Sequence, residues 1–398
     1  MNFILSRIQN KIIAAFLIVL LIPLLSYIYI YFSTSRTVTD IVINYELDEL
    51  VLSLRTLRHH LQNIMNDTKY MSESRDMIRF LSEKQSGSDS EIENALSLIA
   101  DNSSSYAINK NMYQHISYID ESGDEIFRLN NDGSRMTFSS AEKLQNQSRR
   151  AFFKETMKMQ AGECYVSNIH LYKEKGKIFK PYQPVINYAT PVFYPNGSRA
   201  GIILVTANAN IFLEGLVSTK HGKPGKICLV DKDGYFLINP DSTKLWGRDV
   251  GTNTNLGDTF RPKYVEEILA QKDGHTFTNQ NLVCHALFIP PGNTEIYWKL
   301  LNIIEIDELT DPVTSLRNIF VLAFIVGIFI SIAIAVYLAR GISGPVHHLT
   351  QVANKISHGE LDVEVKTKSR DEIGQLADSI NRMRASLEAA IIRLRKNR

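Results

Sequence analysis

Histidine and cysteine are the residue types in this chain that could act as catalysts or metal ligands, and neither is spaced for it. None of the ten histidines stands in the H-E-x-x-H pattern of zinc hydrolases, and the chain has no G-x-S-x-G nucleophile elbow. The three cysteines, Cys164, Cys228 and Cys284, are too few and too scattered for a disulfide framework or a zinc site. Cys228 and Cys284 could pair if adjacent, but buried free thiols are the favoured interpretation. The sequence therefore predicts no catalytic residue, no metal site and no cofactor.

Two other polar motifs have competing interpretations. His347-His348 and His358 could be phosphoacceptors, but the chain has no G-x-x-x-x-G-K-[ST] loop, no kinase glycine box and no Gly-Gly-Asp-Glu-Phe signature. Solvated helix-end histidines are therefore the favoured interpretation. The run from Asp231 to Gly234, "DKDG", could open a calcium loop. It lacks the acidic residue at position five and the closing glutamate at position twelve, so a hairpin turn is expected instead.

Two uncharged apolar runs, residues 12–32 and 318–338, are long enough to cross a bilayer, which needs roughly 20 such residues. The first could be a cleaved signal peptide. However, its apolar region is too long and it ends in aromatic instead of small residues, so an uncleaved anchor is expected. Basic residues precede the first run and follow the second. This charge pattern places the tail 1–11 and the C-terminal part in the cytoplasm and residues 33–317 outside, in a multi-pass protein of the cell membrane.

The composition of the chain, 44% apolar and 22% charged residues, is ordinary for a folded protein. Its formal net charge is +2, and no basic stripe interleaved with aromatic residues is present, so no nucleic-acid partner is expected.

Between the two apolar runs, leucines first recur with a helical period. The Ser/Gly-rich break "KQSGSDS" follows, and after it comes a second helical stretch, 90–111. The period then changes to two, which is typical of strands.

The strand region shows the same order of elements twice. Each half has two strands joined by a tight turn, then a helical insertion, then three further strands. "HISYIDESGDEIFRLN" opens the first half and "KICLVDKDGYFLINP" opens the second. The pattern predicts an α+β fold with two antiparallel-sheet modules on a long N-terminal helix.

The order of these segments resembles the double Cache sensor domain of bacterial receptors, over about residues 40 to 310. "YQHISYIDESGDEIFRLN", "LQNQSRRAFF", "GECYVSNIHL" and "PVINYATPVF" are similar to the membrane-distal module in a group of such sensors that occurs on histidine kinases and cyclic-dinucleotide enzymes. The resemblance implies two PAS-like modules, a distal one at about 106–215 and a proximal one at about 225–308.

The resemblance also implies a ligand pocket in the distal module, between its sheet and an overhanging loop and helix. An arginine there can bind a carboxylate with a planar fork of donors, phenylalanines can close the apolar side, and hydroxyl groups can complete the site. The residues expected to do so are Arg149, Arg150, Phe152, Phe153, Tyr118, Tyr188 and Thr190. Asn187 stands where similar sensors often have an arginine, which puts a strongly anionic ligand in doubt.

The C-terminal part contains two amphipathic helical stretches with apolar residues at alternating spacings of three and four. The first stripe is Ile342, Val346, Leu349, Ala353 and Ile356, and the second runs from Ile373 to Leu394. A connector of about 357–369 is long enough to let the two helices lie parallel, with Leu361, Val363 and Val365 holding it against them. A simple dimerisation zipper explains the stripes but not the connector.

This region, 339–392, resembles a HAMP domain, followed by a tail at 393–398. The residues that carry the resemblance, and the expected signal transmission, are Pro345, Gly359, Glu372 and Gly374. The resemblance implies a parallel homodimer, closed as a four-helix bundle, that converts movement of membrane helices into a change of packing.

Three classes of function are compatible with these features to different degrees. The leading one is a non-enzymatic receptor that binds a small extracytoplasmic molecule, such as an amino acid, carboxylate or amine, and signals to a cytoplasmic partner. The second is the sensory half of a histidine kinase, diguanylate cyclase or chemoreceptor. The third, an extracytoplasmic hydrolase, lacks a recognisable nucleophile, base or metal cluster.

Overall fold

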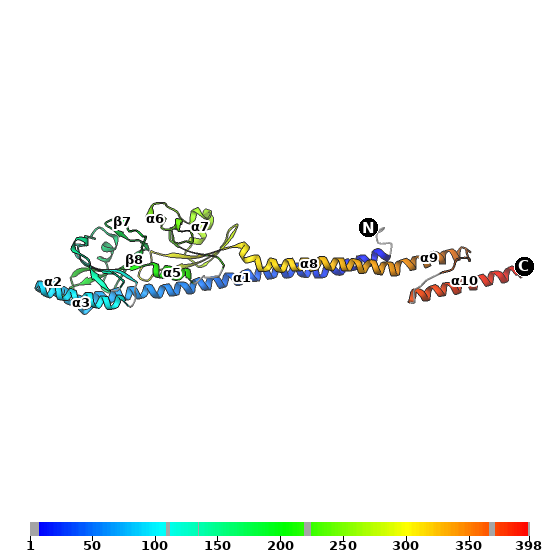
Figure 1. Cartoon of the computed structure of the whole chain (residues 1–398), viewed down its shortest axis with the longest axis horizontal. Helices are drawn as coiled ribbons and strands as arrows, with labels where there is room; N and C mark the ends of the chain where they lie inside the picture. The colour runs from blue at the N-terminus through cyan, green and yellow to red at the C-terminus, as the bar shows by residue number, and fades with distance from the viewer. Residues whose placement is uncertain (1–7, 109–111, 134, 219–223, 366–370, 397–398) are drawn as a thin grey trace. The chain divides into compact units, whose positions relative to one another are not determined.

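The computed structural model of the chain describes residues 8–108, 112–133, 135–218, 224–365 and 371–396. The chain divides into two compact units. One unit is Thr39–Leu309 and contains both large sheets (Figure 1). The other combines Met1–Val38 with Thr310–Arg398 and contains the apolar helical segments and the C-terminal helix pair.

Three helices lie along one side of the sheets (Figure 1): α1 (Ile8–Glu73), α2 (Arg75–Ser86) and α3 (Asp89–Ile108). The predicted leucine period of α1 is its buried stripe, since Leu50, Leu57 and Leu61 are at most 2% exposed. The helix ends before Ser74, whose hydroxyl accepts a hydrogen bond from the Met77 amide at 3.2 Å and so caps α2. The long helix and α3 confirm the prediction, whereas α2 was not predicted.

The distal module is built on a seven-stranded sheet. Its order is β3-β2-β1-β9-β8-β4, with β5 also pairing to β8, and every pairing is antiparallel. The alternation of apolar and polar residues predicted these strands, apart from the short β3. Their bounds are β1 Tyr113–Asp120, β2 Glu125–Asn131, β3 Met136–Phe138, β4 Tyr165–Val166, β5 His170–Leu171, β8 Pro184–Phe193 and β9 Arg199–Asn208.

The proximal module is built on a five-stranded antiparallel sheet of order β11-β10-β14-β13-β12. Its last strand, β14 (Trp298–Glu305), continues directly into α8 (Ile306–Leu338). The last strand of the proximal sheet is therefore covalently joined to the helix that carries the second apolar run. The other strands are β10 Lys226–Asp231, β11 Phe236–Ile238, β12 Gly274–Phe277 and β13 Asn281–Phe288.

Both predicted hairpin turns are present. Gly123 and Gly234 have φ values of +85° and +83°, a left-handed conformation that favours glycine at these positions. In the "DKDG" turn, one oxygen of Asp231 accepts hydrogen bonds from the amides of Asp233 and Tyr235, both at 3.0 Å. The turn between β10 and β11 is therefore an aspartate-stabilised hairpin, as expected from the sequence.

Each sheet is covered on both faces. The faces toward α1, α2 and α3 share one hydrophobic core that contains side chains from both modules. The opposite faces carry separate clusters under short helices. The remaining elements are η2 Ala141–Lys143, α4 Ala151–Thr156, β6 Lys173–Glu174, β7 Lys177–Ile178, α5 Asn210–Ser218, η3 Ser242–Lys244, α6 Gly247–Val250, η4 Leu256–Asp258 and α7 Pro262–Leu269.

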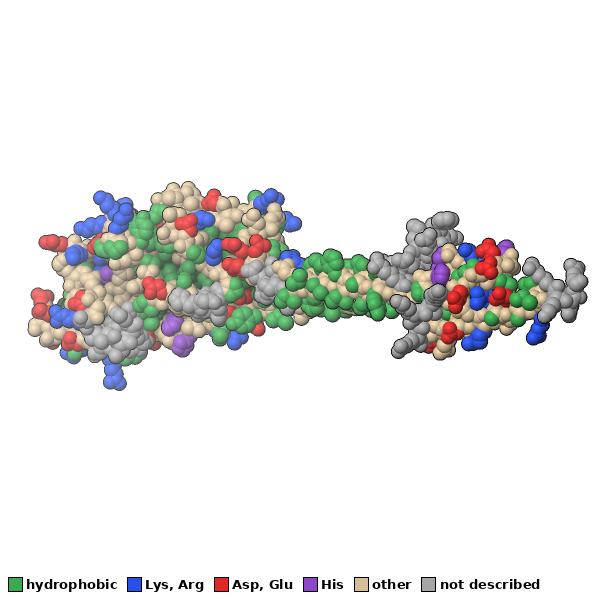
Figure 2. Space-filling view, turned by 45° about the vertical axis from the view of Figure 1, so that its right-hand side comes forward, with side chains coloured by type: hydrophobic (Ala, Val, Ile, Leu, Met, Phe, Trp, Pro, Cys, Tyr) green, Lys and Arg blue, Asp and Glu red, His purple; other side chains and the backbone are tan. Residues whose placement is uncertain are grey.

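The second unit contains one helical stretch, Arg317–Ser357, that is long and apolar enough to cross a membrane among the described residues. It includes the predicted span 318–338. Figure 2 shows a band of hydrophobic side chains in this unit, before its C-terminal helix pair, with no charged side chain within the band on the visible face. The span predicted at 12–32 lies within α1 and stays a prediction.

The C-terminal helix pair has the predicted arrangement. After the π-helical segment Ala339–Ser343, α9 (Gly344–Ser357) and α10 (Glu372–Lys396) run in the same direction (Figure 1). Leu361, Val363 and Val365 of the connector pack against the core of the pair. Asn381 fixes the connector with two hydrogen bonds to the Val365 backbone, at 3.0 and 2.9 Å.

Only part of the predicted stripes forms the contact within one chain. The buried residues there are Leu349, Val352, Ile356, Val365, Ala377 and Ile380. Three members of the second stripe, Leu376, Met383 and Leu387, are 48%, 48% and 43% exposed. These side chains are therefore available to another helix.

Candidate functional site

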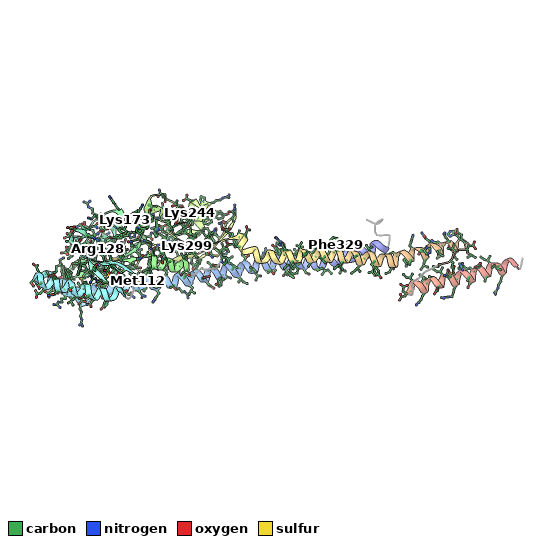
Figure 3. The ribbon with its side chains drawn as sticks, in the orientation of Figure 1. Met112, Arg128, Lys173, Lys244, Lys299 and Phe329 are labelled. Atoms are coloured by element: carbon green, nitrogen blue, oxygen red, sulfur yellow. The ribbon has the colours of Figure 1, made fainter. Side chains whose placement is uncertain are left out.

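The distal sheet carries a cavity of about 70 Å³ on the face turned away from α1, which we name the distal cavity. It lies between strands β1, β2, β8 and β9 and the segment that leads into α4. Figure 3 shows Arg128 and Lys173 within the distal module and Lys244 and Lys299 within the proximal one. The residues that line the distal cavity are His115, Ser117, Glu125, Arg128, Gln145, Gln147, Arg150, Phe152, His170, Tyr172, Lys173, Gly176, Val185, Asn187, Leu204 and Thr206.

A buried ion pair lies in the wall of the distal cavity. Arg128 donates from Nε to Glu125 Oε1 at 2.8 Å and from its terminal nitrogen to Oε2 at 2.5 Å. Ser117 Oγ and the Gln145 amide also donate to Glu125, at 2.7 and 3.1 Å. Burial alone would lower the pKa of Arg128, but the bonds and charge of Glu125 outweigh it and hold that pKa above its ordinary value. The ion pair therefore belongs to the cavity wall, and both carboxylate oxygens of Glu125 already accept hydrogen bonds.

His115 and Tyr172 form a tilted ring pair at the same cavity, with ring centroids 5.0 Å apart. Nδ1 of His115 lies 2.8 Å from Asn130 Oδ1, whereas its buried Nε2 has no hydrogen-bond partner among the described residues. Burial, assisted by the positive charge of Arg128, lowers the pKa of His115 to about 4. His115 is therefore neutral near pH 7 and presents one ring nitrogen to a hydrogen-bonding group.

Asn187 forms part of the cavity wall contributed by β8. It is paired with Thr206 of the neighbouring strand β9, and the Thr206 hydroxyl donates a hydrogen bond to Asn187 Oδ1 at 3.0 Å. Its backbone amide donates to Ser167 Oγ at 2.9 Å. A neutral amide thus lines the cavity at this position.

Arg150 and Phe152 are the expected ligand-binding residues that line the distal cavity. Arg150 is exposed, and its guanidinium lies 5.8 Å from the centroid of the Phe152 ring. It has no carboxylate partner among the described residues, in contrast to Arg128. The cavity wall therefore offers one unmatched positive charge.

Five of the expected ligand-binding residues do not line the distal cavity. Arg149 is exposed outside it, and Phe153 packs in a hydrophobic cluster with Ile119. The Thr190 hydroxyl donates to the Glu163 carbonyl at 2.8 Å. Tyr118 and Tyr188 are fully buried on the opposite face of the sheet, in the core with α1 and α2.

The position of the two tyrosines corrects the expected pocket wall and has a simple physical cause. Successive strand residues point to opposite faces, so Ser117 reaches the cavity while Tyr118 reaches the helices. Tyr118 packs edge-on against Phe80 of α2, with centroids 5.5 Å apart, and donates its hydroxyl to the Ala200 carbonyl. Its hydroxyl is therefore part of the core.

Sequence reasoning missed most of the polar residues of the cavity, among them His115, Arg128, His170 and Tyr172. The period of two in "HISYID" could have placed His115 and Ser117 on one face. His170 and Tyr172 lie in a segment with very short strands, for which the sequence carries no clear period.

The expected transmission residues lie at the ends of the C-terminal helices. Pro345 stands in the first turn of α9, where its missing amide costs no helical hydrogen bond. Gly359 has φ +92° just after α9, and Glu372 is the first residue of α10. Gly374 donates its amide to Asp371 Oδ1 at 3.3 Å. All four therefore lie at or near the ends of α9 and α10, and their role in signal transmission stays a prediction.

The chain is similar to known sensory proteins along most of its length. The family model for the bacterial histidine kinase sensor domain matches residues 41–298, and the HAMP domain model matches 337–389. A sensory transducer protein of Acetivibrio thermocellus is 35% identical over 79 residues, which are 20% of this chain and 14% of that protein. Methyl-accepting chemotaxis protein TlpB of Bacillus subtilis is 25% identical over 193 residues, 48% of this chain and 27% of that protein. The chain thus spans less than a third of the length of these two curated relatives.

Solved structures with a similar fold are also sensor domains. The extracellular domain of the histidine kinase vpHK1S-Z8 matches with a TM-score of 0.58 and 19% identity, covering 70% of this chain and 96% of that one. The periplasmic sensory domain of the Campylobacter jejuni chemoreceptor Tlp1 matches with a TM-score of 0.51 and 14% identity, covering 69% and 99%. The resemblance to double Cache sensors and HAMP domains is confirmed, and the chain belongs to the bacterial histidine kinase sensor-domain family, with a HAMP domain after the sensor.

Proposed function

We propose that this chain is the sensing part of a membrane receptor that binds a small extracytoplasmic molecule and passes a conformational signal through α8 and the HAMP domain to a cytoplasmic output. The observation that carries the proposal is the guanidinium of Arg150, which lies at a cavity of the unit Thr39–Leu309 (the sensor unit) and has no carboxylate partner among the described residues. A carboxylate, such as that of an amino acid, can accept paired hydrogen bonds from it. The proposal gives this chain no catalytic step.

The proposed organisation follows the sequence boundaries. A cytoplasmic tail at 1–11 precedes a first span at 12–32, the sensor occupies 33–317, and a second span at 318–338 leads to the HAMP domain at 339–392 and a tail at 393–398. Both termini then lie in the cytoplasm, and the lipid bilayer surrounds the two spans. The apolar stretch of α8 supports the second span.

A parallel homodimer through α9 and α10 is part of the proposal. Leu376 and Met383 are each 48% exposed in the single chain, although they belong to a regular apolar stripe. An apolar stripe of this kind is stabilised when a second helix covers it. The pairing of two such helix pairs closes a four-helix bundle.

The output is proposed to be a chemotaxis or kinase module. Several curated relatives are methyl-accepting chemotaxis proteins of Bacillus subtilis, and another is the sensor histidine kinase WalK of the same organism, 24% identical over 173 residues. A diguanylate cyclase is the alternative. In each case the chain acts as the sensory half of the complete receptor.

A fusion of residues 1–392 to a reporter kinase module tests the proposal. We expect a ligand to change autophosphorylation and Arg150→Gln to remove that change. Replacing Gly359 or Glu372 is expected to lock the output in one state while dimers persist, since both lie where the connector joins the helices. A ligand response that is unchanged in both of these variants would argue against transmission through the HAMP domain.

A further inference from the structure

A second, larger cavity lies between the distal and proximal modules, and we name it the intermodule cavity. Its volume is about 340 Å³, against about 70 Å³ for the distal cavity. Binding sites for small organic molecules have volumes of roughly 300–1,000 Å³. The intermodule cavity therefore has room for such a molecule in this conformation, and the distal cavity does not.

The two cavities share part of their walls. Arg150, Phe152, His170 and Asn187 line both of them. The proximal module contributes Tyr235, Trp246, Arg248 and two aspartates to the intermodule cavity alone. A molecule bound there would contact both modules at once.

The carboxylates of the intermodule cavity already have cationic partners. Asp231 Oδ2 lies 3.0 Å from a terminal nitrogen of Arg248. Asp249 Oδ1 lies 3.1 Å from Lys173 Nζ, and its Oδ2 accepts the Leu171 amide at 3.0 Å. Arg150 has no such partner among the described residues, so its guanidinium can pair with an anionic group of a ligand.

Aromatic side chains of both modules also line the intermodule cavity. Phe152 lies beside Arg150, and the Tyr235 ring lies 4.5 Å from the guanidinium carbon of Arg248, which covers it. Trp246 is 7% exposed and also lines the cavity. A planar apolar body can pack on such rings while its carboxylate meets the guanidinium.

We infer that the intermodule cavity is a binding site for small carboxylates with a planar apolar body, held by Arg150 and by aromatic side chains of both modules. The inference deepens the proposed function, on which it rests, by assigning the site and the class of ligand. Because the ligand contacts both modules, its binding stabilises their contact and reaches the proximal sheet that continues into α8.

Benzoate and its neutral isostere benzamide test the inference on the full chain in lipid nanodiscs. Tryptophan fluorescence is a direct readout, because the chain has two tryptophans and Trp246 lines the cavity. We expect a saturable fluorescence change with benzoate and none with benzamide at the same concentrations. Arg150→Gln, a change at an exposed side chain, should raise the apparent Kd by about tenfold or more.

Two further variants separate the cavities. Tyr235 lines only the intermodule cavity and Gln147 only the distal one. We expect Tyr235→Leu to weaken benzoate binding and Gln147→Ala to leave it unchanged. The reverse pattern would overturn the inference and leave the proposed function intact, since it would place the ligand in the distal cavity. The lack of any saturable response to benzoate would also overturn the inference.

Discussion

The hydrogen bond between Trp298 and Asn168 joins the proximal module to the wall of the distal one. Trp298 Nε1 donates to Asn168 Oδ1 at 2.6 Å, and the indole is fully buried and stacked on Phe288, with ring centroids 5.5 Å apart. Trp298 begins β14, the strand that continues into α8. We therefore expect this bond to contribute measurably to the contact between the modules.

The expected magnitude follows from the burial of the bond. Trp298→Phe keeps an aromatic ring against Phe288 but removes the N–H donor and part of the ring volume. The lost hydrogen bond costs about 1 kcal/mol and the smaller ring about 1–2 kcal/mol more. Asn168→Ala removes the acceptor. Because both variants delete the same bond, their costs should not add, and the double variant should be about 1 kcal/mol more stable than the sum predicts.

Thermal unfolding followed by a thiol-reactive dye measures these changes in the full chain. Cys164, Cys228 and Cys284 are buried thiols without a disulfide, as predicted, and all lie in the sensor unit. The dye therefore reports unfolding of that unit and not of the C-terminal helices. Additive effects of the two single variants, within about 0.3 kcal/mol, would refute the coupling.

Replacing Glu125 by Ala leaves the Arg128 guanidinium buried without its carboxylate, and we expect the same dye assay to show a loss of about 3–5 kcal/mol. Burial lowers the pKa of His115 and of His285 to about 4, so the unfolded chain binds more protons than the folded one between pH 4 and 6.5. The unfolding temperature should therefore fall as pH falls through this window, and His285→Gln should flatten the slope; an unchanged slope would contradict the role of His285. In the C-terminal helix pair, a single cysteine placed at Leu376, Met383 or Leu387 on the exposed stripe should cross-link between two chains. Equal cross-linking by cysteines at the outward control positions Ser379 and Arg382 would argue against the homodimer.

Local patterns in the sequence predicted most of the fold. The leucine period of α1, the paired hairpins and the connector residues Leu361, Val363 and Val365 all depend on neighbours in sequence, and the structure has them as expected. The faces of the strands were harder to assign. Strand β1 is apolar on both faces, with Ile116 toward the helices and Ile119 toward α4, so its period does not tell which face meets the cavity.

Contacts between distant segments could not be predicted. Lys299 is fully buried in β14, a mostly apolar strand. Its ammonium donates to the carbonyls of Ala270 and Lys272, just after α7, at 3.0 and 2.6 Å. The intermodule cavity has the same origin, since its walls come from segments that lie far apart in the chain, such as those of Arg150 and Tyr235. No local period carries that information.

Ligand-dependent stabilisation of the full chain tests the central claim most directly. The thiol-dye unfolding assay, run with a collection of small amino acids, carboxylates and amines, should find at least one compound that raises the unfolding temperature in a concentration-dependent way. A ligand that binds only the folded form at about 100 times its Kd stabilises it by about 2.7 kcal/mol. Arg150→Gln should remove this gain without lowering the unfolding temperature of the free protein. The absence of any stabilising compound, or a gain that persists unchanged in Arg150→Gln, would contradict the account.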